Sequence, residues 1–168
     1  MGWLHRLDRL TGQIIAAAQW LALPLILLLF LQWPLRDLVG CCSREANDLG
    51  QIIFALFVAV SVTAATRAGT HLASDALAHR FSAHTRHRLR KAAATLAVLP
   101  WASFIFIASK PIVLTSLLGL EAFPDSYNPG YFIIKATLWL LALLMIAQAF
   151  LDIFLPPRQG DACWSGVD

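Results

Sequence analysis

The sequence predicts an all-α membrane protein with four transmembrane helices and one short amphipathic helix at the membrane surface. Of its 168 residues, 58% are hydrophobic and only 14% are charged, whereas soluble domains usually contain about 25% charged residues. The mean hydropathy is +0.66. The apolar residues form four stretches that approach or exceed the roughly 20 residues needed to cross a bilayer. We therefore treat residues 1–168 as a single four-helix transmembrane domain.

The first predicted span covers residues 12–34, which lie between Arg9 and Arg36 and contain no charged residue. Apolar residues cover every face of this helix, which is typical of a membrane span rather than of a surface helix. Pro24 falls inside it, as Pro100 does in the third span. Because neighbouring groups in a membrane protein satisfy the carbonyl that a proline leaves free, we expect kinks at these positions and not breaks.

The second and third predicted spans cover residues 49–66 and 90–109. The second contains a row of small side chains at four-residue spacing, and in the third two alanines and a tryptophan follow one face at the same spacing. Such rows let helix backbones approach closely. We expect them either to pack the four spans against one another or to face another subunit. The rows are Ala55, Ala59 and Thr63 in the second span and Ala93, Ala97 and Trp101 in the third.

The fourth predicted span covers residues 130–155 and carries one charge near each end. Lys135 lies about 8 Å inside its first end at 1.5 Å per residue, and Asp152 lies close to its last end. Both side chains are expected to extend toward the membrane surface. Gln148 is a further polar residue, located late in this span.

Residues 66–91 separate the second and third spans and hold six of the thirteen Lys and Arg residues and four of the five histidines. Together with the N-terminus and the C-terminal tail, this segment places nine basic residues on one side of the membrane and four on the other. Basic residues favour the cytoplasmic side. We therefore expect both termini and residues 66–91 to be cytoplasmic, in a multi-pass membrane protein.

Within this segment, residues 71–81 have the pattern of a short amphipathic helix in the headgroup layer, where basic side chains attract anionic phospholipids. Arg67, His71 and Asp75 follow one another at four-residue spacing. On a helix such residues are neighbours. We expect them to form a local lock at the end of the second span, with Arg67 reaching a lipid phosphate or a partner carboxylate.

Several classes of function are disfavoured by residues that the sequence lacks. The histidines are not accompanied by Cys or carboxylate residues at zinc-site spacing, and no span contains a histidine at the depth that haem ligation requires. The basic segment has no interleaved aromatic residues typical of nucleic-acid binding. No catalytic set is recognisable, and no acidic residue lies at mid-bilayer, where a carrier normally needs one. We expect no enzyme activity, no metal and no cofactor.

The motif TRAGTHLASDAL resembles a segment of the small membrane subunit of tripartite ATP-independent periplasmic (TRAP) transporters, the DctQ-like family. The matching positions are Arg67, Gly69, His71, Asp75 and Leu77. The following basic run, the segment QWPLRDLVGCCSREANDLGQ and the last span with Gln148 also resemble this family. Ala73 departs from it, because the family often has Arg or Val there.

The resemblance implies a chain of the bacterial inner membrane that works with a large multi-span permease subunit and a periplasmic substrate-binding protein in sodium-coupled import. The large subunit would hold the substrate and sodium sites and move like an elevator. The small subunit would enlarge the fixed scaffold and help to dock the binding protein. Two alternatives remain open from the residues alone, namely a self-contained four-helix homodimeric carrier and a membrane anchor for a redox complex.

Overall fold

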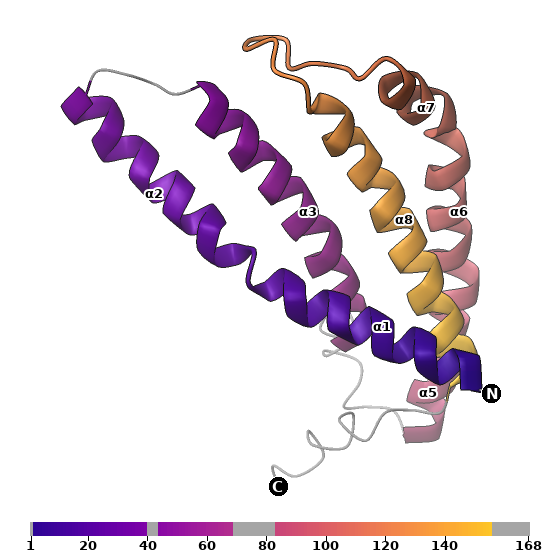
Figure 1. Ribbon diagram of the computed structural model, residues 1–168. Helices are drawn as coiled ribbons and strands as arrows, with labels where there is room; N and C mark the ends of the chain where they lie inside the picture. Colours follow the sequence, from indigo (N-terminus) through magenta and orange to yellow (C-terminus); the bar gives the residue numbers. More distant parts are fainter. Residues whose placement is uncertain (1, 40–43, 69–82, 156–168) are drawn as a thin grey trace, which may run out of the picture.

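The computed structural model describes residues 2–39, 44–68 and 83–155, and this part of the chain is built from helices (Figure 1). Its one β-type pairing is an isolated bridge between Ala122 and Pro129. The all-α prediction is therefore confirmed for the described residues. The amphipathic helix expected at residues 71–81, with His71 and Asp75, lies outside them. The helices are α1 (Gly2–Gln19), α2 (Ala22–Val39), α3 (Arg44–Ala68), α5 (Ala83–Ala93), the π-helix η1 (Ala94–Val98), α6 (Leu99–Ala108), α7 (Lys110–Leu118) and α8 (Tyr131–Phe154).

Four helical segments are long and apolar enough to cross a membrane, which confirms the predicted number of candidate spans. They are Trp3–Leu31, Arg44–Ala68, Lys91–Ala108 and Tyr131–Phe154. The second begins five residues earlier than the predicted residue 49, because Glu45 in its first turn suits the positive end of the helix dipole. These segments identify the chain as a multi-pass membrane protein.

Helix α8 lies at the centre of the arrangement and packs against α3, α6, α7 and α1. In Figure 1, α3, α8 and α6 run side by side, while α2 splays away from α8 and α6. Small side chains permit close packing around α8, where Ala142 and Ala149 are almost completely buried. The α6–α8 contact is fixed by a hydrogen bond of 3.0 Å from Trp139 Nε1 to Ser109 Oγ.

The first predicted span differs from the expected single kinked helix, since it is divided into α1 and α2 by a turn at Trp20 and Leu21. Pro24 has no N–H to donate to the Trp20 carbonyl. That carbonyl instead accepts a bond of 3.3 Å from the N–H of Leu23. The expectation of a kink without a break is therefore wrong at this position: a tight turn replaces the regular helical bonds.

The third span also changes its helical geometry ahead of a proline. The N–H of Leu99 donates to the Ala94 carbonyl in the five-residue pattern of a π-helix, directly before Pro100. The buried positions of this span are Ala94 and Ala102. The predicted row lies one position away from them: Ala93 and Ala97 are exposed, and Trp101 is 50% exposed.

The helix ends gather at two opposite ends of the structure. The N-terminus of α1, the last turn of α3, α5 and the last turn of α8 lie at one end, here called the Arg67 end (Figure 1). The first turns of α3 and α8 lie with α7 at the other end, here called the Glu121 end. Residues 119–130 connect α7 to α8 at the Glu121 end.

Candidate functional site

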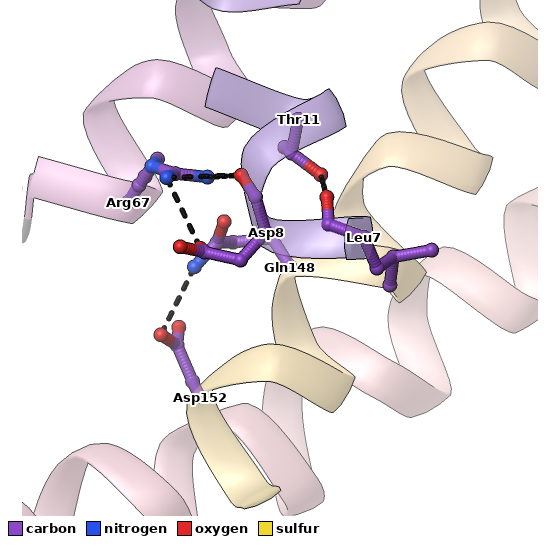
Figure 2. A network of polar contacts seen from close by, with 6 residues as sticks. All are labelled: Leu7, Asp8, Thr11, Arg67, Gln148 and Asp152. Carbon is purple, nitrogen blue, oxygen red and sulfur yellow. Dashed lines mark hydrogen bonds and ion pairs between the residues drawn. The ribbon is translucent and has the colours of Figure 1, made fainter. Parts of the chain in front are cut away.

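The first polar cluster lies at the Arg67 end and joins α1 to α3. Arg67 Nη2 lies 3.1 Å from Asp8 Oδ1. The same guanidinium donates two hydrogen bonds to the backbone carbonyl of Asp8, at 3.3 Å from Nη1 and 3.2 Å from Nη2. Figure 2 shows the guanidinium reaching both the backbone carbonyl and the carboxylate of Asp8. Arg67 thus binds both the carboxylate and the backbone carbonyl of Asp8, and so holds α1 against the last turn of α3.

The local sequence of α1 makes room for this contact. A Cβ atom at Gly12 would lie 3.3 Å from Arg67 Nη2, which is a tight distance. One position earlier, buried Thr11 donates its hydroxyl to the Leu7 carbonyl at 2.8 Å, so its polar group is satisfied within its own helix. Glycine and threonine at these positions therefore allow Arg67 to approach α1 closely without leaving the threonine hydroxyl unpaired.

Helix α8 contributes the other half of the cluster. Gln148 is completely buried and donates from Nε2 to Asp152 Oδ1 at 3.0 Å. Its carboxamide oxygen is buried without a hydrogen-bond partner among the described residues. Asp152 also attracts the Arg67 guanidinium electrostatically. The cluster therefore links α1, α3 and α8 through one guanidinium and two carboxylates (Figure 2).

Arg67 contacts Asp8, a partner that was not among those expected, and its expected lock with His71 and Asp75 lies outside the described residues. Asp152 accepts a hydrogen bond from Gln148, and its expected extension toward the membrane surface stays a prediction. One signal pointed to Asp8: it sits beside a stripe of residues spaced by three or four, formed by Leu4, Leu7, Thr11, Ile15 and Ala18, which is the inner face of α1.

The second polar cluster lies at the Glu121 end and is centred on Glu121. Its carboxylate accepts hydrogen bonds of 2.5 Å from both Ser116 Oγ and Lys135 Nζ. These hydrogen bonds, led by that from Lys135, lower the pKa of Glu121 below its usual value. Lys135 also lies 5.1 Å from the ring centre of Tyr131. Lys135 was expected to extend toward the membrane surface. In the structure its ammonium group contacts the Glu121 carboxylate.

Further contacts fix residues 119–130 to α3. Ser126 Oγ donates to the Asp48 carboxylate, and Arg44 Nη1 donates to the Asp125 carbonyl at 3.3 Å. Within the segment, the N–H of buried Phe123 donates to the Asn128 carbonyl, and the Phe123 carbonyl accepts from the N–H of Tyr127, both at 2.9 Å. The segment is therefore folded onto the ends of α3, α7 and α8. No pattern in the sequence signalled the two contacts with α3, because they join residues 78 and 81 positions apart in the chain.

Three residues of this segment have positive φ angles, which the tight path of the backbone requires. They are Leu120 at 43°, Tyr127 at 55° and Gly130 at 146°. The angle at Gly130 is one that residues with a Cβ rarely adopt. A Cβ there would also lie 3.4 Å from Ile52 and Phe123. Gly130 thus lets the segment turn directly into α8 while remaining packed on α3.

The row predicted on the second span lies partly inside the structure. Ala59 is 2% exposed, Thr63 is completely buried, and Ala55 is half-buried. The Thr63 hydroxyl donates to the Ala59 carbonyl at 3.1 Å. Nearby, Thr66 Oγ1 lies 3.6 Å from Met145 Sδ of α8. Ala59 and Thr63 thus lie in the interior, where small side chains allow α3 and its neighbours to approach closely.

Both clusters consist of carboxylates, cations and neutral polar groups that bind one another. Within residues 2–39, 44–68 and 83–155, no group of three or more His, Cys, Asp or Glu residues is placed to hold a metal ion. The chemistry that these side chains supply is hydrogen bonding and ion pairing between helices. Comparison with protein-family models, characterised proteins and solved structures finds no match to this chain.

Proposed function

We propose that this chain is the small, non-catalytic membrane subunit of a sodium-coupled tripartite solute importer. Its role is to extend the fixed scaffold on which a large elevator-type permease subunit moves, and to help dock a periplasmic substrate-binding protein. The proposal rests on the DctQ-like motif that begins at Arg67 and on the four candidate spans. With both termini in the cytoplasm, as the basic residues predict, the Arg67 end faces the cytoplasm of a bacterium and the Glu121 end faces the periplasm.

The observation that carries the scaffold role is that the polar groups near the ends of the spans connect elements of the chain to one another. Arg67 joins α3 to α1, and Lys135 joins α8 to residues 119–130 through Glu121. Polar contacts between helices fix their relative positions. A scaffold subunit requires such fixed positions, because a moving permease domain needs a surface that does not move with it.

The exposed row on the third span is the surface that we assign to the large subunit. Ala93, Ala97 and half-exposed Trp101 face outward, whereas Ala94 and Ala102 are buried. In a membrane, helices associate through van der Waals packing, and small side chains permit the closest approach. Helix α8 packs against the inner side of this span, and a large subunit packed on the row would cover its outer side.

Coexpression with a large multi-span permease subunit of the TRAP type, taken from the genome that encodes this chain, tests the proposal. We expect the two proteins to copurify, and Ala97→Leu to weaken the association because its side chain would separate the backbones. Leu96→Phe is the matched control, since Leu96 is 78% exposed on the same span but lies one residue, about 100° around the helix, from Ala97. Sodium-driven solute uptake by liposomes that contain this chain alone would refute the proposal and favour the homodimeric carrier.

A further inference from the structure

Helix α1 presents three different faces along its length. The inner face contains Leu4, Thr11 and Ala18, which are all buried. At 3.6 residues per turn, the exposed remainder divides into an apolar sector and a polar sector. The apolar sector contains Trp3, Leu10, Ile14 and Ala17, and the polar sector contains His5, Arg6, Arg9, Gln13 and Ala16. An apolar sector beside a basic polar sector is typical of a helix at the membrane surface.

The length of the first apolar segment also indicates that part of it does not cross the membrane. Trp3–Leu31 contains 29 residues, or about 43 Å of helix at 1.5 Å per residue. The hydrocarbon core is about 30 Å thick. The uncharged part of α2, residues 22–35 ahead of Arg36, alone provides about 21 Å. Because the turn at Trp20 and Leu21 separates the two helices, α2 accounts for most of the crossing without α1.

The contacts of α1 give its course relative to the spans. Asp8 contacts Arg67 at the last turn of α3, and Ala18 packs with Val60, seven residues earlier in α3. Along α1 the ten residues from Asp8 to Ala18 cover about 15 Å, whereas the seven residues from Val60 to Arg67 cover about 10 Å. Helix α1 therefore crosses α3 obliquely (Figure 1), and its first half lies with the last turn of α3 at the Arg67 end.

The charges at this level match an anionic surface. Arg6 and Arg9 point outward from α1, and exposed Arg88 of α5 lies at the same end. Asp8 is engaged with Arg67 on the inner side, so it does not face the outer surface with Arg6 and Arg9. The outward polar sector is thus basic. Trp3 and Leu10, which are 63% and 55% exposed, are suited to insertion beside it.

We propose that α1 is an interfacial helix whose Arg6 and Arg9 bind anionic phospholipid headgroups while Trp3, Leu10 and Ile14 insert among the acyl chains. The Asp8–Arg67 contact holds the helix at this depth. The spanning part of the first segment is then α2 with the last turns of α1. This inference does not depend on the proposed transport function, since it concerns only the position of α1 in the bilayer.

The depth of α1 is tested on the full chain in nanodiscs of phosphatidylcholine and phosphatidylglycerol. Spin labels are attached at Gln13→Cys and Ile14→Cys in a chain whose own cysteines are replaced by serine. We expect the label at position 14 to collide mainly with oxygen and the label at position 13 mainly with a water-soluble nickel reagent. Equal, oxygen-dominated accessibility at both positions would show a helix surrounded by acyl chains and overturn the proposal.

The charge requirement is tested with a fluorophore at Ile14→Cys that is quenched by brominated phosphatidylglycerol in a phosphatidylcholine background. A basic residue near an anionic surface contributes about 1 kcal/mol, which corresponds to roughly fivefold in relative binding. We expect the preference for phosphatidylglycerol to fall in Arg6→Gln/Arg9→Gln, by up to about 25-fold, and to stay unchanged in Lys110→Gln at the other end. No preference in the unmodified helix, or equal preference in the double variant, would contradict the proposal.

Discussion

Replacing either partner of the Asp8–Arg67 contact should destabilise the chain by different amounts. The two charged atoms are 3.1 Å apart, and the side chains are 27% and 19% exposed. At an effective dielectric constant of about 20, two unit charges at this distance attract by about 5 kcal/mol, and desolvation offsets most of that energy. Exposed pairs contribute about 0.2–1 kcal/mol, whereas breaking a fully buried pair costs about 3–5 kcal/mol.

The geometry determines which substitution costs more. Arg67→Gln removes the ion pair and both hydrogen bonds to the Asp8 carbonyl, and it leaves Asp152 without its attractive charge. We expect a loss of about 2 kcal/mol, between the limits for exposed and buried pairs. Asp8→Asn keeps the backbone acceptor and the attraction of Asp152 for Arg67. We therefore expect a smaller loss of about 1 kcal/mol.

Unfolding of the full chain by SDS in mixed micelles provides the measurement, with the single variants and the double variant compared in a double-mutant cycle. We expect a coupling energy of about 1 kcal/mol between the two positions. Arg88→Gln is the control, because Arg88 is exposed at the same end, and it should change the free energy of unfolding by less than about 0.5 kcal/mol. A coupling energy near zero, or a larger loss in Asp8→Asn than in Arg67→Gln, would refute this reasoning.

Three further predictions concern the Glu121 end and the helix packing. The pKa of Glu121 is lowered from 4.5, mainly by its hydrogen bond from Lys135. The stabilising contribution of this carboxylate is therefore present above about pH 4.5 and is lost as the pH falls through the folded-state pKa. Thermal stability should fall less across this acidic range in Glu121→Gln, and an unchanged pH profile in that variant would argue against the contact. Gly130→Ala should destabilise the chain by about 1–3 kcal/mol, because alanine does not favour a φ of 146°, and a neutral result in SDS unfolding would mean that the turn relaxes. Ala59→Leu should cost about 1–3 kcal/mol by overpacking and Ala55→Leu clearly less, since Ala59 is the more buried residue; similar losses would contradict the packing described here.

The sequence was sufficient to predict the spans because their signal is local. Each span is a continuous run of apolar residues, and its length and composition can be read without knowledge of its neighbours. The break between α1 and α2 was harder to predict from the sequence. Pro24 signalled a disturbance, but whether the freed Trp20 carbonyl is satisfied through a kink or through a turn depends on how the two halves pack.

The polar contacts were not predictable for a related reason. Asp8 and Arg67 lie 59 residues apart in the chain, and so their pairing depends on the crossing of α1 over α3. The same holds for Asp48 and Ser126, which are 78 residues apart. In the third span the buried residues are Ala94 and Ala102, one position beyond the predicted row, because four-residue spacing identifies a possible helix face but not which face the neighbouring helices cover.

Sodium-driven uptake by proteoliposomes tests the central claim most directly. A large permease subunit that copurifies with this chain is reconstituted with a periplasmic substrate-binding protein, and uptake is measured with and without the chain. The scaffold role predicts uptake only when the chain is present, with no uptake by liposomes that contain the chain alone. Full uptake by the permease and binding protein without this chain would contradict it.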